Sequence, residues 1–161
     1  MQAPQFTTAA QESLAAAQSA AATANHAELA PIHVLAALLA DPSSTTASVL
    51  QRAGVDPRKA ASVAQAELQS MPRVQGGSPT PGRDLQQTIT DAQRLAQGMK
   101  DAYISTEHLL LALAAGRSQA RRVLDTVGAD ERALRRAVEE IRKASGVDHV
   151  NDANAESSFE A

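Results

Sequence analysis

Two histidines, His33 and His108, are the side chains best suited to catalysis or metal binding, and they lie 75 residues apart in similar surroundings. A metal site needs three or four converging ligands. Neither histidine has a second histidine four residues on, nor carboxylates at ligand spacing. We therefore expect both to have a shared structural role near the start of a helix, and we expect no metal to bind.

Other catalytic patterns are missing from the sequence. The chain has no cysteine, no Gly-x-Ser-x-Gly motif and no paired carboxylates near a histidine, so neither nucleophilic nor acid–base catalysis has a visible site. The glycine-rich stretch at 72–82 lacks the Lys-Ser/Thr pair of a phosphate-binding loop. The sequence thus predicts that this chain is not an enzyme and holds no cofactor.

Charge and hydropathy argue against nucleic-acid and membrane partners. The net charge is −3, and four acidic residues with no Lys or Arg lie in 146–161, so the rest of the chain carries about +1. Basic residues between 117 and 143 alternate with acidic ones, as on a solvated helix surface. No run approaches the roughly 20 apolar residues of a membrane span. The lack of cysteine fits a cytoplasmic location.

An internal repeat positions the two histidines. The stretch from Ala27 to Leu38 matches the stretch from Ala102 to Leu113 at a constant offset of 75 residues. A Val-Leu pair followed by Gly-x-Asp recurs later at an offset of 74, with glycines at Gly54 and Gly128. A duplicated unit determines the whole fold, because neighbouring copies must bury a common core.

Each half of the chain is predicted to form four helices. The first helices span about 8–24 and 83–99, where apolar residues recur at helical spacing. The second helices begin at Pro31 and after Ser105, the third end at the two glycines, and the fourth run to about 70 and 145. The Ala- and Leu-rich composition favours this class. We expect an all-α fold of eight helices in two pseudo-twofold repeats, about 6–70 and 83–145, joined by a surface linker at 71–82.

These motifs resemble the Clp N-terminal repeat domain of AAA+ unfoldases, over residues 6–145. The second copy reads Ile-x-Thr-Glu-His-Leu-Leu from Ile104, the first copy preserves half of it, and both continue to Val-Leu-x-x-x-Gly-x-Asp. Within the family, Met71 to Gly77 and Val150 to Glu156 are similar to the ClpB type. The resemblance assigns 1–145 to one domain and 146–161 to a flexible acidic tail or the start of a linker to an ATPase domain.

The resemblance implies a module that captures unfolded or aggregated client segments for a homo-hexameric, ATP-driven ring. The isolated domain is expected to be a monomer. The alternative within the same fold is a docking site for adaptor proteins or tagged clients, as in ClpA- or ClpC-type unfoldases.

Five residues are candidates for client binding. The resemblance transfers Thr7, Asp101 and Glu107, whose repeat mates differ in type. Structural alternatives are a helix N-cap for Thr7, a favourable helix-dipole interaction for Glu107 and a solvated loop position for Asp101. Ile89 and Tyr103 are the apolar candidates, since unfolded clients expose hydrophobic side chains; both could instead be part of the core.

Overall fold

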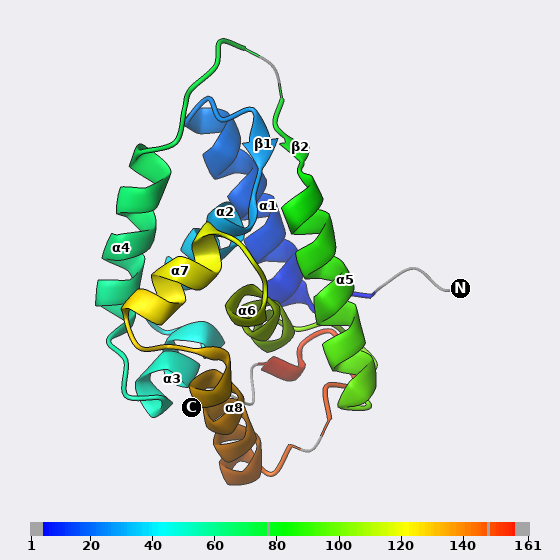
Figure 1. Cartoon of the computed structure of the whole chain (residues 1–161). Helices are drawn as coiled ribbons and strands as arrows, with labels where there is room; N and C mark the ends of the chain where they lie inside the picture. The colour runs from blue at the N-terminus through cyan, green and yellow to red at the C-terminus, as the bar shows by residue number, and fades with distance from the viewer. Residues whose placement is uncertain (1–4, 77, 148, 157–161) are drawn as a thin grey trace.

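The computed structural model describes residues 5–76, 78–147 and 149–156, and eight helices lie within them. Figure 1 shows outer helices arranged around a central one, α6. The prediction of an all-α fold with eight helices is confirmed. The first repeat holds α1 (Thr8–Thr23), α2 (Pro31–Leu39), α3 (Thr45–Arg52) and α4 (Pro57–Gln69); the second holds α5 (Arg83–Gly98), α6 (Thr106–Ala115), α7 (Gln119–Thr126) and α8 (Glu131–Ser145).

The helices pack with the predicted pseudo-twofold symmetry. Helix α1 lies against α2 as α5 lies against α6, and α2 packs on α4 as α6 packs on α8. Between the repeats, α3 contacts α8 and α4 contacts α7. The two contacts are equivalent, because α3 corresponds to α7 and α4 corresponds to α8 in the repeat. The two repeats therefore bury one common core.

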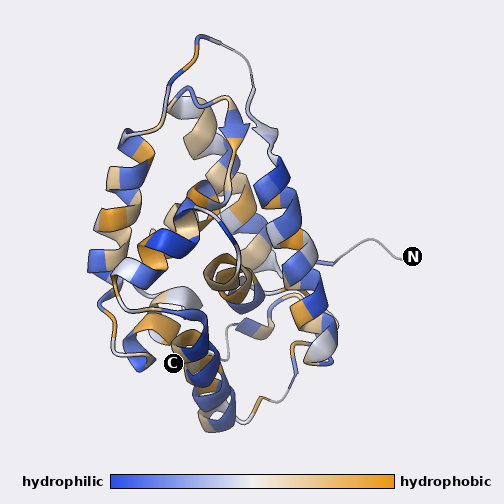
Figure 2. Cartoon of the chain, in the orientation of Figure 1, coloured by the Kyte–Doolittle hydropathy of each residue, from blue (hydrophilic) through white to orange (hydrophobic). Residues whose placement is uncertain are grey.

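Helix α6 forms the centre of that core. Its residues from Thr106 to Ala114 are all buried, including Leu110 and Leu111 at 0% exposure. Figure 2 shows α6 as predominantly hydrophobic, whereas α5 and α8 carry mixed colours because they present their polar sides to solvent. Of the helices in the described part of the chain, none is long and apolar enough to cross a membrane.

The predicted helix boundaries rest on local geometry. Thr7 is the N-cap of α1, and its Oγ1 accepts a hydrogen bond from the Ala10 N–H at 3.2 Å. Pro31 is the first residue of α2, and Ser105 is the N-cap of α6. The glycines after α3 and α7 have φ near +83° and +84°, a conformation that favours glycine.

The segment between the repeats is partly fixed by backbone pairing. Strand β1 (Glu28–Leu29) pairs in parallel with β2 (Thr80–Pro81), with Glu28 opposite Thr80. The sequence predicted a surface linker at 71–82 and no strand, because a two-residue pairing has no period that a pattern can reveal. Figure 1 shows this pairing beside the start of α5.

The segment after Gly146, expected to be a flexible acidic tail or the start of a linker, packs against the helices in the part that the structure describes. Val150 and Ala155 are buried, and the Val150 carbonyl accepts hydrogen bonds from the Ala102 and Tyr103 N–H groups at 2.9 and 3.2 Å. The Thr8 N–H donates to the Ala153 carbonyl at 2.8 Å. The acidic composition suggested disorder, but two small apolar residues anchor this segment. Residues 148 and 157–161 of the predicted tail lie outside the described residues.

Candidate functional site

Each repeat begins its second helix with the same histidine arrangement. The Nδ1 atoms of His33 and His108 accept hydrogen bonds from the N-cap backbone N–H groups of Ala30 and Ser105, at 2.9 and 2.8 Å. An Nδ1 atom that accepts leaves the proton of a neutral imidazole on Nε2. The predicted structural role near the helix start is confirmed.

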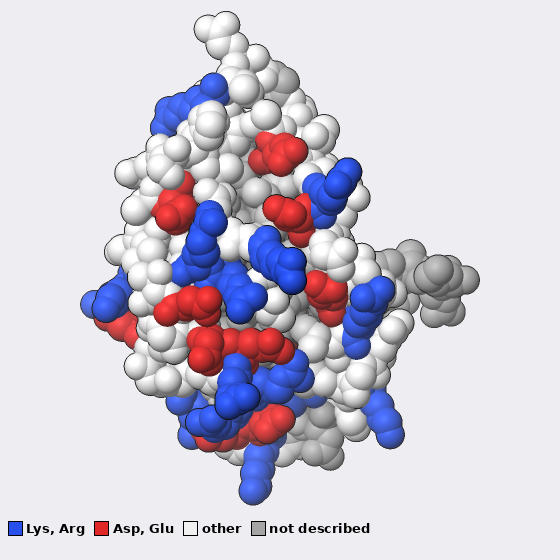
Figure 3. All heavy atoms as spheres, viewed as in Figure 1, with Lys and Arg blue, Asp and Glu red and all other residues white. Residues whose placement is uncertain are grey.

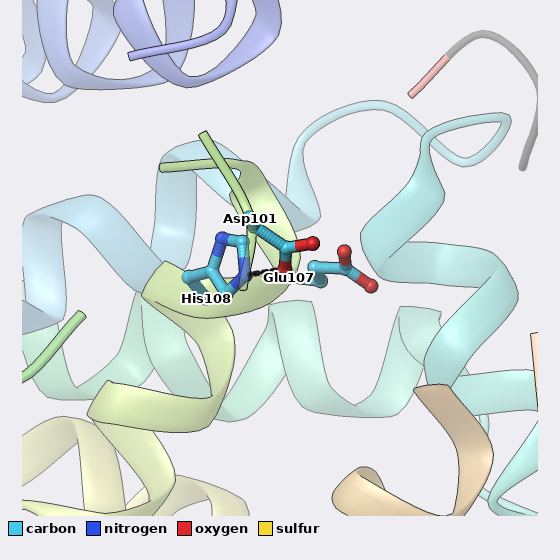
Figure 4. A group of neighbouring side chains, drawn as sticks. All are labelled: Asp101, Glu107 and His108. Atoms are coloured by element: carbon cyan, nitrogen blue, oxygen red, sulfur yellow. Dashed lines mark hydrogen bonds and ion pairs between the residues drawn. The ribbon is translucent and has the colours of Figure 1, made fainter. Parts of the chain in front are cut away.

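The Nε2 atoms of the two histidines meet different partners. His33 Nε2 lies 2.8 Å from His26 Nδ1, and burial together with the charge of His26 lowers the pKa of His33. In the second repeat His108 Nε2 lies 2.7 Å from Asp101 Oδ2 (Figure 4). The same position thus holds a histidine–histidine pair in one repeat and a histidine–carboxylate pair in the other.

Asp101 and Glu107 belong to a buried ion-pair network rather than to the surface. Arg142, in the last turn of α8, donates from Nη2 and Nη1 to the two Asp101 oxygens at 2.8 and 3.1 Å, and it also pairs with Glu107. Asp101 and Glu107 are only 8% and 3% exposed. The alternative of a solvated loop position for Asp101 is therefore wrong, and the favourable place of Glu107 in the first turn of α6 is confirmed.

The network determines the charge state of Asp101. Burial opposes ionisation of its carboxyl group, but hydrogen bonds from His108, Arg142 and the Val150 N–H outweigh it and lower the pKa of Asp101 to about 2. The same network raises the pKa of Arg142 above its usual value, against the opposing effect of burial. Both groups are charged at neutral pH, so the pair is a true salt bridge.

We expect acid to weaken the fold through Asp101. Its pKa falls from 3.8 to about 2 on folding, so its stabilising contribution is complete above pH 3.8 and is lost as the pH drops through about 2. Urea unfolding between pH 5 and 2 measures this effect. Asp101→Asn should show a smaller dependence of stability on pH in that window; equal slopes for the two proteins would contradict this assignment.

One cluster has the composition of a metal site. Ligand atoms of Asp101, Glu107 and His108 lie within 4.8 Å of one another, a convergence that sequence spacing did not predict. The guanidinium of Arg142 already binds both carboxylates, and His108 Nε2 is bonded to Asp101. A dication would have to displace this guanidinium, so the donor set fits a salt bridge better than a metal ion.

The five predicted site residues are not gathered into one open surface. Thr7, Asp101 and Glu107 are buried, whereas Ile89 on α5 and Tyr103 before α6 are half-buried against the core. Residues 150–156 lie over this region, with bonds to Asp101, Tyr103 and Thr8. The structure therefore brings Asp101 and Glu107 together through Arg142, while Ile89 is held by the packing of α5.

An apolar groove lies elsewhere, and none of the five candidates lines it. A pocket of about 400 Å³ lies between α5, the end of α6 and α8. Leu95, Met99 and Ala112 contribute its apolar surface, with Arg94 and Arg135 among the charged residues that line it. The sequence signal for it was the helical spacing of Leu95, on α5, and Met99, the C-cap residue of α5, which also fits a core stripe.

Charged side chains are interleaved over the face built by α7 and α8. Figure 3 shows Lys and Arg alternating with Asp and Glu there. Arg121 pairs with Asp125 and Arg135 with Glu131, both one helical turn apart and both largely exposed. This agrees with the predicted solvated helix surface.

The duplicated helices and the buried histidine and carboxylate pairs define an all-helical repeat domain. The profile of the Clp repeat (R) N-terminal domain family matches residues 5–127, and the chain belongs to this family. The predicted resemblance is confirmed.

Relatives by sequence are ClpB chaperones. The chain is 36% identical over 157 residues to "Chaperone protein ClpB" of Rhodopirellula baltica, covering 97% of this chain and 18% of that protein. It is 38% identical over 143 residues to ClpB of Mycobacterium tuberculosis, covering 88% of this chain and 17% of that protein. The chain therefore corresponds to less than a fifth of these relatives.

Solved structures share the fold. The N-terminal domain of Hsp104 from Candida albicans superimposes with a TM-score of 0.82 at 21% identity, covering 94% of this chain and 99% of that one. A complex of the ClpV N-domain with a VipB peptide matches with a TM-score of 0.64 at 19% identity, covering 76% of this chain and 79% of that one. At these identities the likeness concerns the fold.

Proposed function

We propose that this chain is the substrate-binding N-terminal module of a ClpB-type protein disaggregase and captures unfolded or aggregated client segments. Similarity to ClpB proteins over 97% of the chain supports this proposal. The rest of the parent protein would supply a cytoplasmic, ATP-driven homo-hexamer, while the isolated domain is a monomer.

The groove between α5, α6 and α8 is the observation that carries the proposal. Its lining combines apolar Leu95, Met99 and Ala112 with charged Arg94 and Arg135. Unfolded segments present apolar side chains in many arrangements, and a flexible methionine adapts to them. A polar rim accommodates the backbone and charged side chains of the same segment. A ClpV N-domain of the same fold binds a VipB peptide, which supports peptide capture by this architecture.

In this proposal, three of the five predicted site residues have a structural role and two remain available for client contact. Thr7, Asp101 and Glu107 hold the starts of α1 and α6 and the adjoining C-terminal segment in position. Direct client contact with them would require residues 150–156 to move away. Ile89 and Tyr103 retain partial exposure and are the members of the set that a client could reach.

We expect an unfolded model protein, titrated into the isotope-labelled domain, to shift backbone amides around Leu95, Met99 and Ala112. Met99→Gln should weaken binding by roughly fivefold to tenfold, because a buried apolar contact of about 1 kcal/mol is lost. The matched control is Val74→Gln, which alters an apolar side chain that is 42% exposed between the repeats and should bind normally.

Two outcomes would redirect the proposal. Shifts centred on Thr7, Ile89, Asp101 and Glu107 would place client capture at the set named from the family resemblance. No shifts with unfolded chains, together with one-to-one binding of a folded partner, would favour the adaptor-docking alternative.

A further inference from the structure

A second pocket, of about 230 Å³, lies between α1, the end of α2, the start of α3 and the beginning of α6. It is separate from the groove between α5 and α8, with which it shares no lining residue. Its polar lining includes Glu12, Ser13, Asp41, Thr46, Thr106 and Glu156.

Two buried oxygen atoms in this lining lack a hydrogen-bond partner in the described structure, Thr46 Oγ1 and Glu156 Oε1. The two residues are each 2% exposed. The other Glu156 oxygen accepts from the Thr106 N–H at 3.0 Å and from the Thr106 hydroxyl. An unpaired buried acceptor is costly, so the pocket is suited to a ligand that donates hydrogen bonds.

The charge of the pocket is negative. Glu12, Asp41 and Glu156 contribute carboxylates, and none of the described residues lining the pocket is Lys, Arg or His. Hydrogen bonds from the backbone and side chain of Ser43 lower the pKa of Asp41, which keeps it ionised. Glu12 and Asp41 are exposed, so they attract a cation from solvent, whereas Glu156 can bind it in a less hydrated setting.

The arrangement of acceptor oxygens in this pocket favours an ammonium group over a metal ion or a guanidinium. The carboxylates of this pocket do not converge as metal ligands, since the converging group among the described residues is Asp101, Glu107 and His108. A planar guanidinium is best matched by the two oxygens of one carboxylate, and one Glu156 oxygen is already bonded to Thr106. An ammonium group has three rotatable donors and can reach separate acceptors. Ala16, Ala37 and Leu38 provide apolar contacts for the methylene chain of a lysine.

We propose that this pocket binds a lysine side chain of the captured client segment, with the ammonium donating to Glu156 Oε1 and Thr46 Oγ1. The inference rests on the proposed function for its source of lysine. The pocket itself can be tested without any client.

Butylammonium tests the pocket alone. Titration into the labelled domain should shift the amides of Thr46, Thr106 and Glu156. Glu156→Gln keeps an acceptor for Thr106 but removes the charge, and should weaken binding roughly tenfold, whereas Glu139→Gln on the exposed side of α8 should not. Thr46→Val replaces the unpaired hydroxyl with a methyl group of similar shape and should weaken binding without disturbing the fold. Absence of these shifts, or equal binding by both pocket variants and the native protein, would overturn the proposal.

A pair of N-acetylated peptides then separates this inference from the proposed function. The two peptides have the same apolar sequence and differ by one lysine replaced with norleucine. Stronger binding of the lysine peptide that disappears in Glu156→Gln supports the pocket. Equal binding of both peptides would overturn the lysine assignment and leave client capture standing. Butylammonium binding with no binding of either peptide would instead contradict the proposed function.

Discussion

Arg142→Met is expected to lower the free energy of unfolding by about 3 to 5 kcal/mol, which is the usual cost of removing one partner from a buried ion pair. The guanidinium of Arg142 is the cation bonded to both Asp101 and Glu107, whose side chains are 0% and 2% exposed. Methionine preserves much of the side-chain volume. The loss of stability therefore reflects the two buried carboxylates left without their cation, and not a cavity. Urea unfolding followed by circular dichroism measures the change.

The matched control is Arg135→Met on the same helix. Arg135 pairs with Glu131 one turn away, and both side chains are more than 40% exposed. Such surface pairs contribute at most about 0.5 kcal/mol. Similar losses for the two variants would show that α8 needs arginine for a reason other than the buried network.

Leu111→Ala is expected to lower the free energy of unfolding by about 2 to 5 kcal/mol, from lost apolar burial and the cavity left behind. Leu111 is fully buried in α6, and α6 contacts helices of both repeats, including α1, α2, α3 and α8. A cavity there affects the packing shared by the two copies. The unfolding transition should remain single, with a lower midpoint, because both repeats depend on one core.

Val74→Ala serves as the comparison, since Val74 is 42% exposed and its truncation should change stability by less than about 0.5 kcal/mol. Two separate unfolding steps for Leu111→Ala would contradict a common core and would show that the repeats are independent folding units.

The repeat made most of the fold predictable from sequence. Helix order, the N-cap at Thr7 and the two left-handed glycines follow from local rules that act within a few residues. The equivalence of His33 and His108 predicted a shared structural role, and hydrogen bonds to the N-caps confirm it. The contacts that differ between the two repeats were harder to predict from the sequence.

Long-range partners escaped prediction. Arg142 lies 41 residues from Asp101, and many basic residues on α8 were equally plausible partners from sequence. The position of Arg142 in the last turn of α8 was the one sequence feature that set it apart. A basic residue there also interacts favourably with the helix dipole, so the position did not indicate a buried ion pair. Burial of Asp101 and Glu107 followed from this unforeseen pairing. The groove at Leu95 and Met99 was likewise hidden within an ordinary apolar stripe.

The C-terminal segment has a mechanical consequence. Its contacts are made in sequence along the chain: Glu156 at the start of α6, Ala153 at the start of α1, and Val150 beside Asp101. Tension applied beyond Glu156 would load these contacts one after another and not all at once. The segment would therefore detach stepwise from Glu156 toward Val150, while α8 and the shared core would carry load only after Val150 had been released.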